Sequence, residues 1–367
     1  MRLRPLLLNT HLVVGLVAAI PLFCLGLSGA ILVFENPLDD ALNRKTALVT
    51  PPSPAAPLSL RALGDTLNRT YPRYRIVLAA FGADDYHAWR IAAVAPDGKG
   101  EADLYLDPYT GKTLGRPGRE SELVGTIHQF HTRFLAGRLG NTITGWSGVA
   151  LLFLAMSGLI LWWPAKILRV RHDVTGWRLA FDLHQMMGGI SWVLLLALAG
   201  SGIVIHWNDE ALRLAGRLTG APPVALPPRA LPECQGKPAL GADSLIAVAR
   251  AEVPGARATV IQVPDDVTRP VRAIFKYPED RTPAGRTLVY LAACSARPVQ
   301  VLSSRTASAA YRWTRMWNRE IHTGDVYGWP TRIVMALASL CLPLMALTGP
   351  IMWWGRRAAA SRPRPGS

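Results

Sequence analysis

The sequence predicts a membrane protein with a bundle of four transmembrane helices and two small α+β modules outside the membrane, arranged as an internal duplication. Three observations predict this fold. Half of the 367 residues are hydrophobic, and the mean hydropathy is +0.19. Four apolar stretches are long enough to cross a bilayer as helices, which takes about 20 residues. The two halves of the chain also repeat the same residue types at the same spacing.

The four apolar stretches have no Asp, Glu, Lys or Arg in their interiors. The first stretch is too long for the apolar region of a cleaved signal peptide, and no clear small-x-small cleavage site follows it. We therefore expect it to be an uncleaved transmembrane helix like the other three. The stretches are Leu12–Phe34, Ile143–Trp163, Met186–Trp207 and Ile333–Trp354.

The formal net charge of +15 would also suit a nucleic-acid-binding protein. The basic residues form no long run, however, and lie at the ends of the apolar stretches, as the positive-inside rule requires. We therefore expect a bacterial inner-membrane protein with both termini in the cytoplasm, long periplasmic segments at 36–142 and 208–330, and no nucleic-acid partner. The flanking residues are Arg2, Arg4, Lys166, Arg169, Arg171, Arg178, Arg356, Arg357, Arg362 and Arg364.

In the repeat, four histidines are followed, pair by pair, by the same residue types at the same spacing. His11 and His184 are each followed by Gly at +4 and by a Ser-Gly pair at +17 and +18. His131 and His322 are each followed by Gly at +6, by Ser-Gly or Thr-Gly at +26 and +27, and by Trp-Trp at +31 and +32. This agreement predicts two copies of a two-helix unit, related by an axis along the membrane normal. The pairs are Ser28-Gly29, Ser157-Gly158, Ser201-Gly202 and Thr348-Gly349.

The two periplasmic segments also correspond to each other. In each, a helix candidate, at 58–69 or 243–252, precedes short strands of alternating apolar residues. This order predicts one helix on an antiparallel sheet in each module. Proline-rich runs at 50–57 and 221–232 are predicted linkers. The predicted strands lie near 74–81, 89–94, 103–114, 259–263, 271–277, 288–291 and 299–302.

The helices that follow His131 and His322 pose a problem of length. An unbroken helix from His131 to Trp163 would be about 48 Å long, so it must project into the periplasm or break near Gly137–Gly140 and fold back. We expect eight segments: transmembrane helix 1 (1–35), module 1 (36–127), a periplasmic extension with transmembrane helix 2 (128–164), a cytoplasmic loop (165–183), transmembrane helix 3 (184–207), module 2 (208–318), a periplasmic extension with transmembrane helix 4 (319–355) and a cytoplasmic tail (356–367).

These features resemble the PepSY-associated transmembrane family, PepSY_TM, whose members are often described as iron-regulated membrane proteins. The resemblance covers nearly the whole chain and rests on the helix–module–helix plan, the turn at 107–111, Leu183-His184, and Thr348-Gly349 followed by Trp353-Trp354. The best-characterised branch is the FoxB-type ferric-siderophore reductase. That branch implies PepSY-like modules, haem b between the helices and electron delivery to a periplasmic ferric siderophore.

Of the eight histidines, His87 and His172 are expected at the solvated surface. Ionisable groups at membrane depth are costly and usually functional. We expect His11 and His184 to form an inner pair at the cytoplasmic face, and His131 and His322 an outer pair at the periplasmic face. The two pairs are too far apart to share one tetrahedral zinc ion. Each pair can instead supply both axial ligands of one haem iron, and without Cys-x-x-Cys-His both haems would be b-type.

Several assignments stay open. His128 lies three residues before His131 on the same helical face and is an alternative outer ligand. His206 either lines a substrate cleft or is an ordinary interfacial histidine. Arg312, Trp313 and Trp317, with Arg315 and Arg319, either orient a ferric chelate or form part of an interfacial belt of aromatic and basic residues.

The cysteines divide by compartment. Cys24 and Cys341 lie in helices and are expected to be packing residues. Cys234 and Cys294 lie in module 2, where an oxidising compartment permits a disulfide, although the sequence does not show that they meet.

The paired histidines thus predict a di-haem b relay, and the resemblance implies that this relay reduces siderophore-bound ferric iron in the periplasm. A transporter that carries iron or siderophore inward is one alternative. A non-enzymatic anchor that regulates a periplasmic partner is another. No flavin motif, quinone site or G-x-G-x-x-G motif is visible, so the cytoplasmic or membrane electron donor stays unnamed, as do the siderophore and the oligomeric state.

Overall fold

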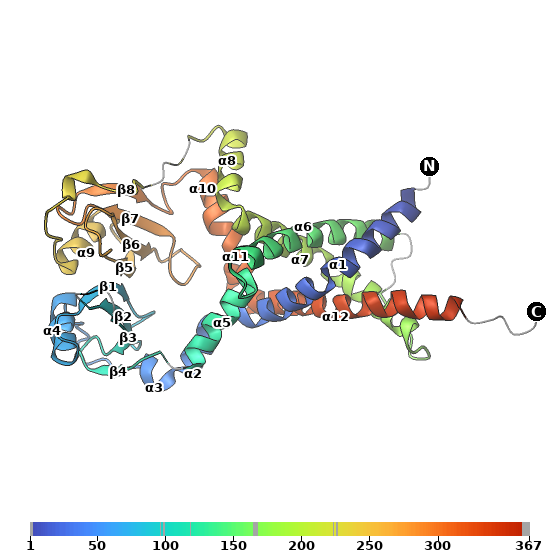
Figure 1. Cartoon of the computed structure of the whole chain (residues 1–367), viewed down its shortest axis with the longest axis horizontal. Coiled ribbons are helices and arrows are strands. Elements are labelled where there is room, and N and C mark those ends of the chain that lie inside the picture. The colour runs from blue at the N-terminus through green and yellow to red at the C-terminus, as the bar shows by residue number, and fades with distance from the viewer. Residues whose placement is uncertain are drawn as a thin grey trace, which may run out of the picture. The chain divides into compact units, whose positions relative to one another are not determined.

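A computed structural model describes residues 3–95, 97, 100–117, 119–163, 168–222, 224 and 227–361 (Figure 1). The flanking residues Arg2, Lys166, Arg362 and Arg364 lie outside these ranges, as does part of the 221–232 linker. The chain forms two compact units. We call Met1–Glu35, Val124–Ala211 and Trp317–Ser367 the helical unit, and Asn36–Leu123 and Leu212–Met316 the sheet unit.

The helical unit contains four helices that are long and apolar enough to cross a membrane, as the sequence predicts. Helix α1 contacts α12 and α6, and α7 contacts the same two helices. Small and branched side chains fill the space between them, among them Ala18, Leu151, Leu195, Ala199 and Leu342. The helices are α1 (Leu3–Leu32), α6 (Gly137–Trp162), α7 (Trp177–His206) and α12 (Trp329–Ala360).

Helix α7 begins earlier than predicted. Its first residue is Trp177, so the last part of the expected loop at 165–183 is helical. Gly176, with φ +60°, precedes the first turn. Arg178, one of the basic residues that flank the predicted transmembrane helix, lies in this first turn. Asp182 is only 2% exposed and accepts hydrogen bonds from the Arg171 backbone N–H and guanidinium at 2.9–3.1 Å.

The chain breaks before two of the four long helices, which resolves the problem of length. Helix α5 (Arg119–Arg133) ends before Phe134 and Leu135, whose positive φ values of 48° and 55° are incompatible with a continuous helix. The break therefore lies just before the predicted Gly137–Gly140. In the second half, α11 (Asn318–Thr323) and the short helix η3 (Asp325–Tyr327) precede α12. Both His131 and His322 thus lie on short helices separate from α6 and α12.

The sheet unit contains one continuous antiparallel sheet of eight strands in the order β4-β3-β2-β1-β5-β6-β7-β8. The two predicted modules therefore share a sheet, because β1 pairs with β5 through Leu78–Gln262, Ala79–Ile261 and Ala80–Val260. This pairing satisfies backbone groups that two separate four-stranded sheets would leave at exposed edges. The strands are β1 (Arg75–Ala80), β2 (Trp89–Val94), β3 (Glu101–Leu106), β4 (Thr113–Gly115), β5 (Arg257–Gln262), β6 (Val271–Lys276), β7 (Thr287–Leu291) and β8 (Pro298–Leu302).

Helices α4 (Leu60–Thr70) and α9 (Ala242–Ala251) pack into the same core as the sheet. Leu63, Leu245 and Phe275 are fully buried there. The Asp243 carboxylate accepts hydrogen bonds from two backbone N–H groups in the first turn of α4, both at 2.8 Å. The remaining helices are α2 (Glu35–Leu42), α3 (Arg44–Ala47), α8 (Asn208–Thr219), η1 (Pro232–Cys234), α10 (Ala309–Tyr311) and η2 (Arg312–Trp317).

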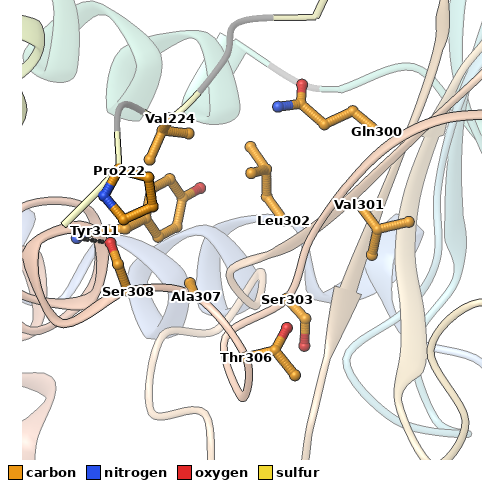
Figure 2. Close-up of a pocket in the computed structure, with 10 residues that line it drawn as sticks. All are labelled: Pro222, Val224, Gln300, Val301, Leu302, Ser303, Thr306, Ala307, Ser308 and Tyr311. Carbon is orange, nitrogen blue, oxygen red and sulfur yellow. Dashed lines mark hydrogen bonds between the residues drawn. The ribbon is translucent and has the colours of Figure 1, made fainter.

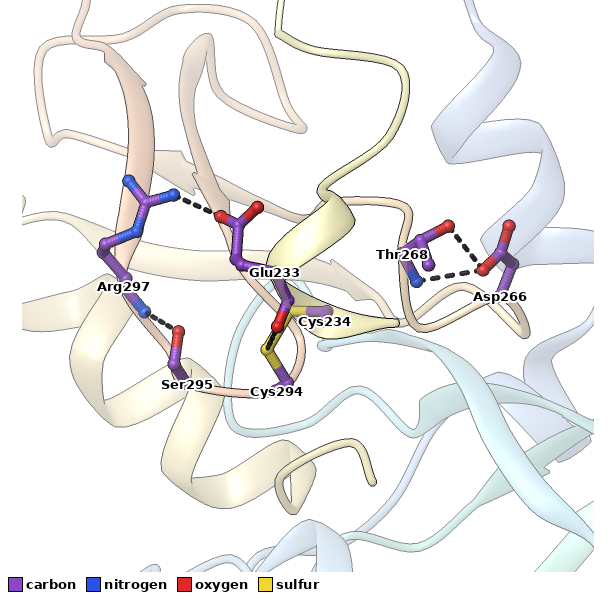
Figure 3. Close-up of a disulfide and its surroundings, with 7 residues drawn as sticks. All are labelled: Glu233, Cys234, Asp266, Thr268, Cys294, Ser295 and Arg297. Carbon is purple, nitrogen blue, oxygen red and sulfur yellow. Dashed lines mark hydrogen bonds and ion pairs between the residues drawn. A yellow bond between two sulfur atoms is a disulfide. The ribbon is translucent and has the colours of Figure 1, made fainter. Parts of the chain in front are cut away.

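Cys234 and Cys294 form a disulfide, which settles the pairing that the sequence left open (Figure 3). The bond joins η1 to the turn between β7 and β8, and Cys234 is fully buried. Arg297 and Glu233 form an ion pair beside it. Cys24 and Cys341 are free.

Replacing both bonded cysteines with Ala is expected to lower the stability of the sheet unit. The bond closes a loop with a sequence separation of 60, and removing such a constraint on the unfolded chain costs about 4 kcal/mol. Thermal unfolding of the purified chain in detergent measures the effect. The Cys24→Ala/Cys341→Ala double variant is the control, and equal unfolding of the two double variants would contradict a stabilising role.

Candidate functional site

The four repeated histidines come together in two pairs within the helical unit. The ring centroids of His131 on α5 and His322 on α11 are 6.4 Å apart, with 58° between the ring planes. His11 on α1 and His184 on α7 lie close enough for their charges to interact. Each pair therefore draws one imidazole from each half of the chain.

The Nδ1 atom of every one of these imidazoles lies within hydrogen-bonding distance of a hydroxyl from a Ser-Gly or Thr-Gly pair. All four contacts therefore use the small residues that recur in the repeat. The contacts are His11–Ser157 at 2.8 Å, His131–Ser28 at 2.9 Å, His184–Thr348 at 3.0 Å and His322–Ser201 at 2.8 Å.

The hydroxyls define which imidazole nitrogen carries the proton. Each hydroxyl donates its only hydrogen to the backbone carbonyl four residues earlier in its own helix, at 2.5–2.9 Å. Its oxygen can then only accept from the imidazole, so Nδ1 carries the proton and Nε2 keeps a lone pair. This is the arrangement in which a histidine binds a metal through Nε2 while a neighbouring group holds the ring in place. The accepting carbonyls belong to Cys24, Phe153, Ala197 and Leu344.

The glycine after each hydroxyl residue leaves room for the ring. A Cβ atom at Gly29 would lie 3.1 Å from Cε1 of His131 and 3.0 Å from the Ser339 hydroxyl, which is closer than nearly all real Cβ contacts. At Gly158 and Gly202 the distances to Cε1 of His11 and His322 would be 3.3 and 3.4 Å. We call each hydroxyl with its following glycine a cradle. In the fourth cradle, a Cβ atom at Gly349 would lie 3.9 Å from Cε1 of His184, which is an ordinary contact.

The outer pair is half-buried and uncharged. Burial is the main cause that lowers the pKa of His131 to about 3 and that of His322 to about 4. The charge of His322 lowers the pKa of His131 further, and that of Arg319 lowers the pKa of His322. At neutral pH both rings are therefore neutral and can act as nitrogen ligands.

Helix α11 is fixed at both ends. Asn318 donates a hydrogen bond from its side chain to the Ser201 carbonyl at 3.0 Å, next to the cradle of His322. After the helix, the Asp325 carboxylate accepts from the Arg332 guanidinium at 2.6–2.8 Å and from the Thr323 hydroxyl at 2.8 Å. The Asp325 and Arg332 side chains are only 9% and 16% exposed. These contacts hold the turn that positions His322.

Replacing Asp325 with Asn is expected to destabilise the helical unit by about 2 kcal/mol, because it removes the charge that pairs with a largely buried guanidinium. Thermal unfolding in detergent measures the change. Glu279→Gln is the matched control, since it breaks an ion pair with Arg305 whose side chains are about half exposed and should therefore leave the melting temperature nearly unchanged. Equal melting of the two variants would contradict a structural role for the buried pair.

The alternative outer ligand has a different partner. His128 lies within 3.1 Å of the Glu35 carboxylate and is 40% exposed, and no cradle hydroxyl contacts it among the described residues. The geometry therefore favours His131 as the outer ligand.

The structure also shows the surroundings of the remaining sequence-predicted residues. His206 packs on α6, where a Cβ at Gly145 would lie 2.4 Å from its Nε2, and its ring contacts Trp207 edge-on at 4.4 Å. Trp313 and Trp317 are 55% and 44% exposed. Arg312 is half-buried at the start of η2.

Among the described residues, no group of three or more His, Cys, Asp or Glu side chains could hold a metal ion. The site consists of two pairs of histidines, and in the outer pair both imidazoles are neutral with their Nε2 lone pairs available. Such a pair suits a metal whose other ligands come from a bound macrocycle. The sequence contained the signal for this geometry in the Ser-Gly and Thr-Gly pairs, but not which histidine each hydroxyl contacts.

Residues 8–356 match the family model described as PepSY-associated TM region. No curated protein matches the chain. The matched range includes all four paired histidines and all four cradles.

Proposed function

Since the chain belongs to the PepSY-associated TM family, we propose that it is an inner-membrane di-haem b electron relay that reduces siderophore-bound ferric iron on the periplasmic side. The product would be Fe²⁺ available for uptake. Family membership alone supports a membrane protein of this class. The more specific proposal rests on the histidine pairs and on the resemblance to FoxB-type ferric-siderophore reductases.

The spacing of the outer pair is the observation that supports haem most directly. A metal–imidazole bond of about 2.0 Å on each side of an iron atom puts the two ring centroids about 6 Å apart. The centroids of His131 and His322 are 6.4 Å apart. Their protons are on Nδ1, so both Nε2 atoms can act as axial ligands. The rings therefore fit bis-imidazole ligation of a haem iron.

His11 and His184 would hold the inner haem, and His131 and His322 the outer one. Haem b, when bound, would supply one-electron transfer. The hydroxyls of the four cradles would orient these imidazoles. The two pairs would provide an electron path from a donor on the cytoplasmic side or in the membrane to the periplasm.

The proposed chemistry needs only one electron per iron. Siderophores bind iron through hard oxygen donors, which favour the higher charge of Fe³⁺. One electron converts Fe³⁺ to Fe²⁺ and weakens the complex, so the metal can leave. In the sheet unit, Arg312 and the exposed Trp313 are the residues that we propose for contact with the ferric chelate.

The disulfide supports a periplasmic location for the sheet unit, because disulfides persist in oxidising compartments. The basic residues that flank the transmembrane helices support cytoplasmic termini. The order of one helix and four strands, which occurs in both halves of the sheet unit, supports an internal duplication.

The function is tested with the full chain expressed with added haem and reconstituted into liposomes. The purified protein should show b-type absorbance that changes on reduction. With a reductant sealed inside and a ferric siderophore outside, Fe²⁺ should accumulate in an external chelator. Protein that contains no haem would refute the relay. Haem-loaded protein that forms no external Fe²⁺ would refute the ferric-reductase assignment alone.

A further inference from the structure

A pocket of about 210 Å³ lies beside β8 in the sheet unit (Figure 2). Its lining includes the apolar residues Pro222, Val224 and Leu302. Hydroxyl groups of Ser303, Thr306, Ser308 and Tyr311 also line it. No acidic side chain is among the described residues that line it. The pocket has no place in the proposed electron relay.

Tyr311 provides the polar group at the centre of this pocket. The residue is only 5% exposed, and among the described residues no hydrogen-bond partner is found for its phenolic hydroxyl. Its backbone N–H donates to the Ser308 hydroxyl at 3.3 Å, and Figure 2 shows its ring directed toward Val224 and Leu302. Since Tyr311 lines the pocket, its hydroxyl is available to hydrogen-bond to a ligand there.

The surroundings of Tyr311 are positively charged. Burial raises the pKa of the Tyr311 phenol, so the hydroxyl keeps its proton and can donate a hydrogen bond, while the charges of Arg315 and Arg286 act in the opposite direction. The next residue, Arg312, has a buried Nε atom without a hydrogen-bond partner among the described residues. Hydrogen-bond donors beside guanidinium groups favour an anionic oxygen as the ligand atom.

The volume limits the size of the ligand. At about 20–30 Å³ per non-hydrogen atom, the pocket has room for roughly seven to ten such atoms. We propose that it binds a small organic carboxylate, whose charged end accepts a hydrogen bond from Tyr311 and whose apolar body contacts Val224 and Leu302. This proposal does not depend on haem binding or on ferric reduction.

The test uses 4-fluorobenzoate as a probe, with ¹⁹F NMR of the full chain in detergent. The probe should bind saturably, whereas 4-fluorobenzamidine, which has nearly the same shape and the opposite charge, should not. Tyr311→Phe should weaken binding of the carboxylate about tenfold, because it removes one hydrogen bond to a charged group. Tyr109→Phe is the matched control, since that hydroxyl donates to the Asp85 carbonyl elsewhere in the sheet unit.

A second variant keeps the proposal testable if Tyr311→Phe does not fold. Leu302→Trp should fill the pocket and abolish binding of 4-fluorobenzoate. Binding of the amidine as tight as that of the carboxylate would overturn the proposed anion preference. Absence of saturable binding to the unmodified chain, or unchanged binding in Leu302→Trp, would overturn the site.

Discussion

Replacing His131 or His322 with Ala is expected to lower the haem content from two per chain to one, and replacing His11 or His184 should remove the other haem instead. Each variant deletes one of two axial ligands in a pair, and the remaining imidazole cannot hold the macrocycle between the helices alone. Haem is counted as the pyridine complex against protein from amino-acid analysis. We expect the His131 and His322 variants to lose the same haem, and the His11 and His184 variants to lose the other one.

His87→Ala and His128→Ala are the matched controls, and both should keep two haems. His87 hydrogen-bonds to Asp84 in the sheet unit, and His128 lies beside Glu35 one helical turn from His131. If His128→Ala lost a haem and His131→Ala kept two, the outer ligand would be His128. If haem loss did not follow the two pairs, the pairing itself would be wrong.

Gly29→Val is expected to abolish the outer haem while the chain still inserts and retains the inner one. Even a Cβ at this position would lie 3.1 Å from the ring of His131 and 3.0 Å from the Ser339 hydroxyl, and valine adds two methyl groups. Because close-packed interiors adapt poorly to added volume, the ring must move out of its cradle. Haem content and the reduced-minus-oxidised spectrum of the purified variant measure the loss.

Gly15→Val in the same helix is the control for inserting a β-branched residue into α1. A Cβ at Gly15 would lie 3.7 Å from Leu154, which is an ordinary contact. The control should therefore keep both haems. Equal haem content in the two variants would show that the cradle glycine does not restrict the position of His131.

The sequence predicts the membrane helices well because length and apolar composition alone determine whether a segment can span a bilayer. The start of α7 is less predictable, since Asp182 resembles a loop residue until its pairing with Arg171 is known. The sequence also could not predict that β1 and β5 join the two expected modules into one sheet. Strand periodicity identifies which face is buried, but not which edges pair.

The repeat predicts the cradle residues but not their partners. Ser28 lies 17 residues after His11 in the same helix, yet it holds His131, and Ser157 in turn holds His11. Spacing along one helix does not specify which other helix approaches it. In both halves of the chain, each ligand is therefore oriented by a hydroxyl from its own half, while each pair requires an imidazole from both halves.

The contacts around α11 have no equivalent in the sequence pattern of the first half. Asp325 and Arg332 lie three and ten residues after His322, whereas Phe134 and Asn141 occupy these places after His131. The repeat could not predict the ion pair, because the pair occurs in one half only. The two outer histidines are therefore followed by different turns. An ion pair stabilises the turn after His322, whereas the turn after His131 contains Phe134 and Leu135 with positive φ values.

The central claim is that two pairs of neutral imidazoles each hold one haem iron. Electron paramagnetic resonance of the oxidised, haem-loaded protein at low temperature tests it most directly, because the spin state of ferric haem reports its axial ligands. With an imidazole on each face of both irons, we predict two low-spin ferric signals of about equal amount and no high-spin signal. A high-spin signal equal to one or both haems, or a single low-spin species in protein that binds one haem, would contradict the claim.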